Sequence, residues 1–229
     1  MSDEPSRRPG FAEHAEHGKG SLYPDEVIAM KVKAELRKRL RGLRRTAPAA
    51  SCEERSNKIR ERILLLPEVV RAKSVALFFP IEGRNEVDLR PLDAALRARG
   101  VVLGYPSIDP DTNVMTFRKV DDLSSLEERG KGFCEPDGAA PELAAPDVVV
   151  VPALAVAPSG HRLGYGAGYY DRMLDPQSGP AKDAFSVVVA YDYQLLMELP
   201  TLPHDVPVRH VVTDLRDFAA EPVPPSPFT

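Results

Sequence analysis

The sequence has few cysteines, no long apolar run and no excess of positive charge. Cys52 and Cys134 are its only cysteines and lie outside any paired motif, which argues against a disulfide framework or a zinc site and fits a cytoplasmic location. The longest apolar run, residues 148–157, contains Pro152 and is too short to span a bilayer. Residues 1–20 are polar and charged, so we expect no signal peptide and no membrane partner. A formal net charge of -4 argues against a protein that mainly coats nucleic acid.

The length of the chain sets its domain organisation. At 229 residues and 25.1 kDa it can form one domain with a substantial core. We predict this domain over residues 23–218, between a disordered N-terminal tail, residues 1–22, and a proline-rich C-terminal tail, residues 219–229.

The most informative stretch is GHRLGYGAGYYDR, residues 160–172. Gly164, Gly166 and Gly168 occupy every second position, which is unfavourable in a helix or strand because glycine loses the most backbone freedom on ordering. A β-branched run, residues 147–152, precedes them, and a helix can begin at Tyr169. A loop that leads into a helix offers free N–H groups and the positive end of the helix dipole. We therefore interpret this stretch as a phosphate-binding loop.

This loop differs from two better-known phosphate loops. A P-loop ends in Gly-Lys-Ser/Thr, whereas this one ends in Gly-Tyr-Tyr, and the dinucleotide fingerprint requires glycine where Tyr169 stands. From spacing alone, a tight glycine turn with two packing tyrosines is the alternative. Arg162 and Arg172 would flank a bound phosphate with positive charge, and Asp171 offers a hard oxygen ligand for magnesium.

Helix and strand patterns alternate along the chain. Apolar spacing predicts a helix over residues 24–45, and a capping box at Ser51 predicts the start of a second helix that ends near Leu66. Further helices are expected over residues 89–99, from residue 169 onward, and before Pro200; strands are expected over residues 74–79, 101–105, 113–118, 147–152, 186–191 and 208–213. A β-α-β order implies right-handed crossovers. We predict an α/β fold, a Rossmann-like three-layer single domain with a mostly parallel sheet and helices on both faces.

A row of basic residues follows the first predicted helix: Lys33, Arg37, Arg41 and Arg44. It is open to three interpretations, namely a solvated basic face, an RNA-binding face, or charges that lean over the glycine loop toward a triphosphate. Spacing does not choose among them.

The string Gly-x-Arg-Leu-Gly-x-Gly-x-Gly-Tyr-Tyr-Asp, residues 160–171, resembles the signature of the 5-formyltetrahydrofolate cyclo-ligase (5,10-methenyltetrahydrofolate synthetase) family. Four shorter segments are also similar to family elements: Lys33 to Arg37, Phe79 with Glu86-Val87-Asp88, the MTFR stretch 115–118, and the GFCEP stretch 132–136. The resemblance covers roughly residues 30–214.

The resemblance implies an enzyme that uses ATP and Mg²⁺ to convert 5-formyltetrahydrofolate into 5,10-methenyltetrahydrofolate, with release of ADP and phosphate, through phosphorylation of the formyl oxygen. It implies catalytic roles for Arg162, Tyr169 and Tyr170, and metal binding by Asp171 and Asp205. ATP would contact Lys33, Arg37, Arg162, Leu163, Gly164, Tyr165, Gly166, Ala167, Gly168 and Tyr169. The reduced folate would contact Phe79, Glu86, Tyr165, Gly166, Ala167, Gly168 and Tyr169, with Glu86 holding the pterin. A cytoplasmic monomer with no nucleic-acid partner is expected.

The chain departs from the family pattern in three places. Val156-Ala157-Pro158 stands where the family usually has Phe-Asp, Ala167 stands where some members have lysine, and the loop 81–88 carries about two extra residues. These departures keep open a nucleotide-binding relative with another small-molecule substrate. A non-enzymatic RNA-binding protein is a second alternative, although the basic helix lacks interleaved aromatic residues.

Overall fold

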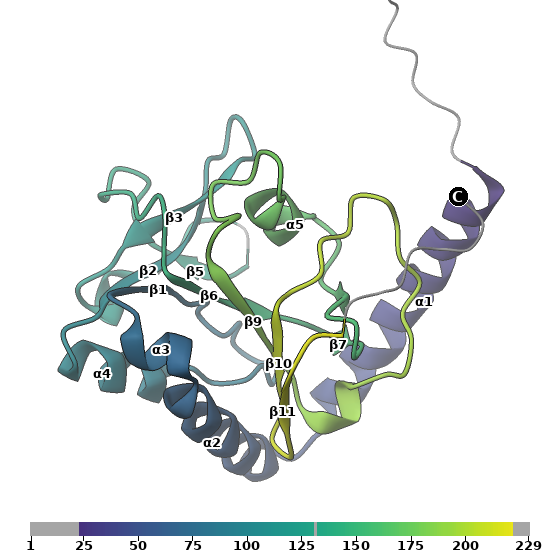
Figure 1. The fold of residues 1–229 in the computed structure, drawn as a ribbon, viewed down its shortest axis with the longest axis horizontal. Helices are drawn as coiled ribbons and strands as arrows, with labels where there is room; N and C mark the ends of the chain where they lie inside the picture. Colours follow the sequence, from purple (N-terminus) through teal and green to yellow (C-terminus); the bar gives the residue numbers. More distant parts are fainter. Residues whose placement is uncertain (1–22, 131, 222–229) are drawn as a thin grey trace, which may run out of the picture.

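A seven-stranded sheet forms the centre of the protein, in a computed structural model that describes residues 23–130 and 132–221 (Figure 1). The strand order is β11-β10-β9-β6-β1-β2-β3. Its members are β1 (Ser74–Ala76), β2 (Val102–Ile108), β3 (Met115–Lys119), β6 (Val148–Pro152), β9 (Phe185–Val189), β10 (His210–Val212) and β11 (Asp217–Ala219). The five inner strands run parallel, and the two edge strands, β3 and β11, are antiparallel to their neighbours. The prediction of a mostly parallel sheet is confirmed.

Helices cover both faces of this sheet. The helices that pack on it are α2 (Ala49–Leu65), α3 (Pro67–Arg71), α4 (Arg90–Ala98) and α5 (Tyr169–Leu174). The chain also forms α1 (Pro24–Arg45) and the 3-10 turns η1 (Leu123–Ser125) and η2 (Asp192–Gln194). Side chains of β6 alternate between the two faces: Val148 and Val150 pack with α2, α3 and α4, while Val149 and Val151 pack with α5. A strand buried on both sides needs a continuous apolar sequence, which explains the run of four valines.

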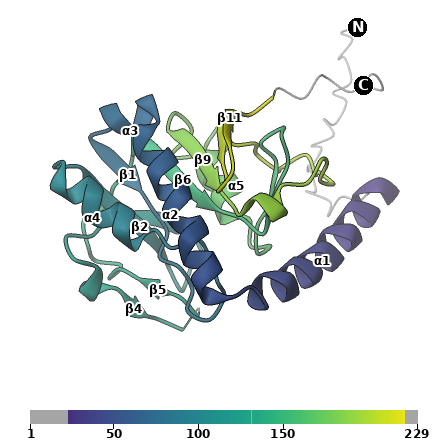
Figure 2. The ribbon, with the colours of Figure 1, turned by 90° about the horizontal axis from the view of Figure 1, so that it is seen from below.

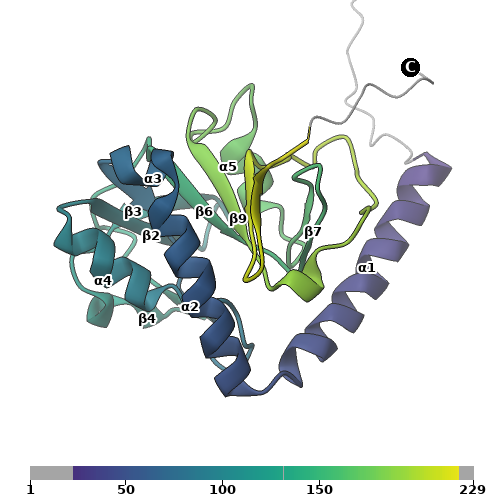
Figure 3. The same ribbon diagram turned by 60° about the horizontal axis from the view of Figure 1, so that its bottom comes forward.

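Helix α1 lies apart from these layers (Figures 2 and 3). Its Leu36 and Leu40 pack on a small hairpin of β7 (Ala155–Val156) and β8 (Arg162–Leu163). The predicted apolar stripe is only partly buried, since Val32 and Leu43 are 43% and 50% exposed. Lys33 and Arg44 are buried instead. The interpretation of the basic row as a solvated face is therefore wrong for these two residues.

The order of the strands determines where along the sheet a binding site can form. From β1 the chain passes through α4 to β2 on one side, whereas β6 pairs with β1 on its other side. In open α/β sheets, ligands bind outside the carboxyl ends of strands at such a switch point. The loop after β1, which carries Phe79 and Glu86, and the segment after β6 both leave the sheet at this edge.

Several local predictions fail for physical reasons. Helix α2 begins at Ala49 with Pro48 as its N-cap, so the capping box at Ser51 does not form. Pro48, with φ -59°, starts the helix before Ser51 is reached. No helix forms over residues 195–200, because Leu196 N–H donates to Val156 O at 2.9 Å and this segment runs beside β7. The β7–β8 hairpin separates β6 from the glycine loop, which was expected to follow β6 directly.

The six predicted strands are all present, several of them shorter than expected, while α3 and β11 were not predicted. β11 ends at Ala219, the first residue of the segment predicted as the C-terminal tail. The predicted N-terminal tail and the rest of the C-terminal tail, apart from Ala220 and Glu221, lie outside the described residues. In the described part of the chain, no helix combines the length and apolar character that crossing a membrane requires.

Candidate active site

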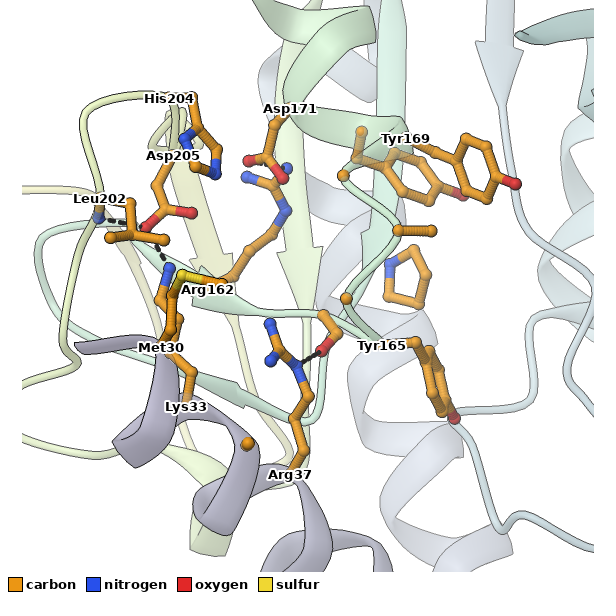
Figure 4. Close-up of a pocket in the computed structure, with 17 residues that line it drawn as sticks. Met30, Lys33, Arg37, Arg162, Tyr165, Tyr169, Asp171, Leu202, His204 and Asp205 are labelled. Atoms are coloured by element: carbon orange, nitrogen blue, oxygen red, sulfur yellow. Dashed lines mark hydrogen bonds and ion pairs between the residues drawn. The ribbon is translucent and has the colours of Figure 1, made fainter. Parts of the chain in front are cut away.

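A cavity of about 550 Å³ lies between α1, the glycine loop (residues 164–168) and the segment 202–205 (Figure 4). A second cavity of about 630 Å³ shares part of its lining, namely Gly166, Ala167, Gly168, Asp171, His204 and Asp205. Segments distant in sequence thus meet here, and most of the predicted ATP-binding and metal-binding residues line the first cavity: Lys33, Arg37, Arg162, Gly164, Tyr165, Gly166, Ala167, Gly168, Tyr169, Asp171 and Asp205. Leu163 is the exception, because its side chain packs against α1.

Arginines hold the carbonyl groups of the glycine loop. Gly164 O accepts from Arg37 Nε at 2.9 Å, Tyr165 O accepts from Arg41 Nη2 at 3.2 Å, and Ala167 O accepts from Arg172 Nη1 at 3.0 Å. The N–H groups of residues 164–168, in contrast, donate no hydrogen bond to any group in the described ranges. Backbone donors need a partner, from water or from a ligand. Five consecutive free donors beside a cavity suit an anion with several oxygens.

Backbone conformation explains two of the loop glycines. Gly166 has φ +111° and Gly168 has φ +67°, both in the region that L side chains rarely adopt. A Cβ on Gly166 would also lie 3.4 Å from Arg37 Cζ. Glycine at this position therefore allows the guanidinium of Arg37 to lie against the loop.

Each of the two predicted metal ligands forms an ion pair with a basic side chain through one carboxylate oxygen. Asp171 Oδ1 accepts from Arg162 Nη2 at 2.9 Å and from Val206 N at 3.2 Å, while Asp205 Oδ2 accepts from Lys33 Nζ and from Leu202 N. Burial lowers the pKa of Arg162, and the nearby Asp171 carboxylate opposes this effect. These ion pairs fix the orientation of both carboxylates at the cavity.

The other oxygen of each carboxylate is free. Asp171 Oδ2 and Asp205 Oδ1 accept no hydrogen bond from the described residues, and both side chains keep some exposure, 24% and 14%. Magnesium is commonly held by one or two carboxylates, with water and substrate phosphates completing its shell. No group of three or more His, Cys, Asp or Glu side chains that could hold a metal occurs in the described ranges. Asp171 and Asp205 thus fit a magnesium ion shared with a phosphate, not an all-protein cage.

The three tyrosines of the loop and of α5 differ in their surroundings. Tyr169 OH donates to Asn113 Oδ1 at 2.6 Å, and the guanidinium of Arg172 lies 5.1 Å from the Tyr169 ring centroid. Burial raises the pKa of Tyr165 to about 12, with a contribution from Glu86, and burial also raises the pKa of Tyr170. The Tyr170 hydroxyl is buried and has no partner among the described residues. It therefore stays protonated beside the cavity.

Phe79 and Glu86 are not among the residues that line either cavity. Phe79 packs against the core cluster formed with α2 and α4. Glu86 is 7% exposed and lies behind Tyr165, whose hydroxyl donates to Glu86 Oε1 at 2.5 Å. The structure thus joins Glu86 to the glycine loop through Tyr165, whereas Phe79 remains on the core side.

The departures from the family pattern have different consequences. Ala157 is buried, donates to His161 O at 2.9 Å within the hairpin turn, and lines neither cavity. Ala167 lines both cavities. The replacement at 157 therefore changes the hairpin interior, and the absence of lysine at 167 removes a charge at the site itself.

Sequence reasoning did not assign Arg44, Asn113 and His204 to the site. Arg44 belongs to the basic row, so the sequence indicated its charge. The sequence did not indicate that Arg44 is buried. His204 precedes a predicted metal ligand and lines both cavities. Asn113 gave no signal, because its contact with Tyr169 joins residues that are 56 positions apart.

Comparison with known proteins identifies the family to which this chain is similar. Residues 29–214 match the model of the 5-formyltetrahydrofolate cyclo-ligase family. A 5-formyltetrahydrofolate cyclo-ligase of Escherichia coli K12 is 30% identical over 178 residues, 76% of this chain and 96% of that protein. One from Mycolicibacterium smegmatis is 49% identical over 74 residues, 32% of this chain and 37% of that protein. The 5,10-methenyltetrahydrofolate synthetase structure from Aquifex aeolicus superposes with a TM-score of 0.71 at 30% identity, and covers 84% of this chain and 95% of that one.

Proposed function

The chain belongs to the 5-formyltetrahydrofolate cyclo-ligase family, and on this premise we propose that it closes 5-formyltetrahydrofolate to 5,10-methenyltetrahydrofolate with consumption of ATP. One observation carries the ATP part of the proposal. The glycine-loop residues, whose five N–H groups have no partner in the described ranges, line the same cavity as Lys33, Arg37 and two carboxylates that each keep one oxygen without a partner there. This combination suits a polyphosphate with its magnesium ion.

The chemistry of the substrate explains why such a site is needed. A formamide oxygen is a poor leaving group when the neighbouring amine attacks the formyl carbon to close the ring. Transfer of the γ-phosphoryl group of ATP to that oxygen releases ADP and converts the oxygen into a phosphate ester. The amine then forms the new C–N bond and loses its proton to solvent, the C–O bond breaks, and the oxygen leaves as part of inorganic phosphate.

The residues of the cavity would contribute positioning and charge. Phosphoryl transfer requires the acceptor oxygen and the phosphorus in line, and stabilisation of the negative charge on the transferring group. Lys33, Arg37 and the glycine-loop N–H groups would bind the phosphate oxygens, while Arg162 would hold Asp171 in place. A magnesium ion on Asp171 and Asp205 would supply charge neutralisation.

Reduced folate would bind next to this phosphate site. We propose that Glu86 accepts hydrogen bonds from the pterin and that Phe79, Tyr169 and Tyr170 border it. The Tyr170 hydroxyl, which has no partner in the part of the chain that the structure describes, supports a contact with the substrate, since buried polar groups normally have a partner. We further propose that the protein acts in the cytoplasm as a monomer, without a nucleic-acid partner, through a single domain over residues 23–218.

Purified protein mixed with MgATP and 5-formyltetrahydrofolate tests this function. We expect the near-ultraviolet absorbance of the methenyl product to grow only when ATP is present. Measurable ATP binding without that absorbance would instead indicate a relative with a different small-molecule substrate. Absence of both would contradict the phosphate-binding role of the glycine loop.

A further inference from the structure

A buried hydrogen-bond network lies behind the glycine loop and includes Glu86, the proposed pterin ligand. It joins Arg44 at the end of α1, Glu86 in the loop after β1, and Tyr165 in the glycine loop. Arg44 Nη2 donates to Glu86 Oε1 at 3.3 Å and to the Tyr165 hydroxyl, which itself donates to the same Glu86 oxygen. Three segments that would bind two different substrates are thus connected through hydrogen bonds.

Arg44 is fixed from several sides. It is 3% exposed, and its Nη1 donates to Ala153 O at 3.4 Å, directly after β6. Asn85, next to Glu86, donates through Nδ2 to Arg44 O and to Ala47 O, each at 3.0 Å. Arg44 Nε is buried and has no partner among the described residues. Arg44 and the loop that carries Glu86 therefore form one rigid unit.

The hydrogen-bonding capacity of Glu86 is nearly used up. A carboxylate has about four acceptor positions, and three are taken: Oε1 accepts from Arg44 and Tyr165, and Oε2 accepts from Ile81 N at 2.8 Å. A pterin presents two adjacent N–H donors on one edge, and a paired contact requires a free position on each oxygen. Oε2 has such a position, whereas Oε1 does not.

Tyr165 is the donor that can give way. Arg44 and Ile81 N belong to the rigid unit, whereas Tyr165 lies between Gly164 and Gly166 in the glycine loop. Glycine on both sides allows the backbone at Tyr165 to change conformation at low steric cost, although such a change gives up the Arg41 hydrogen bond to Tyr165 O and the arginine contacts with the Tyr165 ring.

We infer that Arg44 is a positioning residue that holds the Glu86 carboxylate in place, and that the Tyr165 hydroxyl occupies the position of a substrate N–H donor until a reduced folate displaces it. The inference rests on the proposed function, because it takes Glu86 as the group that binds the pterin. Tyr165 belongs to the loop that would bind phosphate, so displacement of its side chain links folate binding to ATP binding. Tyr165 is thereby a determinant of folate affinity and of the coupling between the two substrates.

Tyr165→Phe tests the displaced hydroxyl. The variant has no hydroxyl to compete for Glu86, so calorimetry without ATP should show 5-formyltetrahydrofolate bound roughly 2- to 10-fold more tightly than by the wild type. The effect of a non-hydrolysable ATP analogue on folate affinity should be smaller than in the wild type. Tyr193→Phe, which removes another buried hydroxyl outside the glycine loop, should bind folate as the wild type does. Unchanged or weaker folate binding by Tyr165→Phe would overturn the inference.

Arg44→Met and Arg44→Lys test the positioning role. Arg44→Met should weaken folate binding by about 10-fold or more while MgADP affinity changes by less than about 3-fold, because Glu86 loses its fixed partner. Arg44→Lys keeps the charge and should retain part of the affinity, and it carries the test if Arg44→Met does not fold. Equal loss of affinity for both ligands, or no loss in Arg44→Lys, would contradict positioning of Glu86.

Failure of this inference is distinguishable from failure of the proposed function. A wild-type protein that forms the methenyl product, with a Tyr165→Phe variant that binds folate no better, would overturn only the inference. A wild-type protein that forms no product would contradict the proposed function itself.

Discussion

At the scale of single residues, Asp171 and Asp205 have matching surroundings. Each uses one carboxylate oxygen for a buried cation, Arg162 or Lys33, and leaves the other oxygen without a partner among the described residues. An ion pair that orients a carboxylate without using both oxygens leaves a ligand atom for a metal. The two basic side chains would therefore act on the proposed metal site through the carboxylates.

Asp171→Asn should reduce magnesium-dependent turnover by on the order of 100-fold, because the amide lacks the charge that magnesium prefers. The variant should also lose the magnesium-dependent part of the thermal stabilisation that ADP gives the wild type. Asp183→Asn, at an exposed position away from both cavities, is the matched control and should behave like the wild type. Near-normal turnover of Asp171→Asn would remove Asp171 from the metal site.

The placement of a residue at the cavity could be predicted only where it belongs to a motif. The glycine signature identified Arg162 and Asp171, which the structure joins at 2.9 Å. The burial of Arg44 could not be predicted, because the same helical spacing serves a solvated and a buried basic face. Its partners, Glu86 and Tyr165, are 42 and 121 positions away in the sequence.

At the scale of elements, the glycine loop and α1 act together. Arg37 and Arg41 hold loop carbonyls, so the loop conformation depends on a helix more than 120 residues earlier in the chain. Two glycines of the loop differ in how well they would tolerate a side chain. Gly166 has φ +111° and contacts Arg37, whereas a Cβ on Gly164 would meet no atom within 4 Å. The two positions offer a matched pair for testing the loop.

Gly166→Ala should weaken ATP binding by roughly 5- to 100-fold, because alanine at this φ costs about 1–3 kcal/mol and its Cβ presses on Arg37. Gly164→Ala should change ATP affinity by less than about 3-fold, since its site has room and needs no positive φ. Equilibrium titration with an ATP analogue measures both. Equal effects of the two substitutions would indicate that the loop conformation seen here is not the one that binds ATP.

Element positions were largely predictable, and their ends and partners were not. The helix over residues 24–45 and all six strands followed from periodicity. The capping box at Ser51 failed because Pro48 starts α2 earlier. Residues 195–200 run beside β7 instead of forming a helix, which is a tertiary contact that no local pattern encodes.

At the scale of the whole molecule, the parallel sheet brings distant loops to one edge. The β-α-β order predicted this arrangement, but not the antiparallel edge strands or the separate position of α1. Buried tyrosines are a second molecule-wide feature, since burial raises the pKa of Tyr105, Tyr165, Tyr170, Tyr191 and Tyr193. Ionisation of these hydroxyls therefore makes the free energy of unfolding depend on pH in the alkaline range.

Stability should fall as the pH rises from about 10 to about 12. Burial raises the pKa of Tyr165 and Tyr193 to about 12, against an ordinary value of about 10. Above pH 10 the folded protein therefore keeps protons that the unfolded chain loses. The contribution of these protons to the free energy of unfolding is fully present below pH 10 and is lost as the pH rises through 12. Urea unfolding at about pH 9 and about pH 11 should show a larger loss of unfolding free energy for the wild type than for a Tyr165→Phe, Tyr193→Phe double variant. Equal losses would contradict the raised pKa values.

The central claim is that the cavity transfers a phosphoryl group from ATP to the formyl oxygen. The most direct measurement labels the formyl oxygen of 5-formyltetrahydrofolate with oxygen-18 and analyses the phosphate released during turnover by mass spectrometry. We predict that the label appears in inorganic phosphate, one labelled oxygen for each methenyl product formed. Unlabelled phosphate, with the label released to water, would contradict phosphorylation of the formyl oxygen.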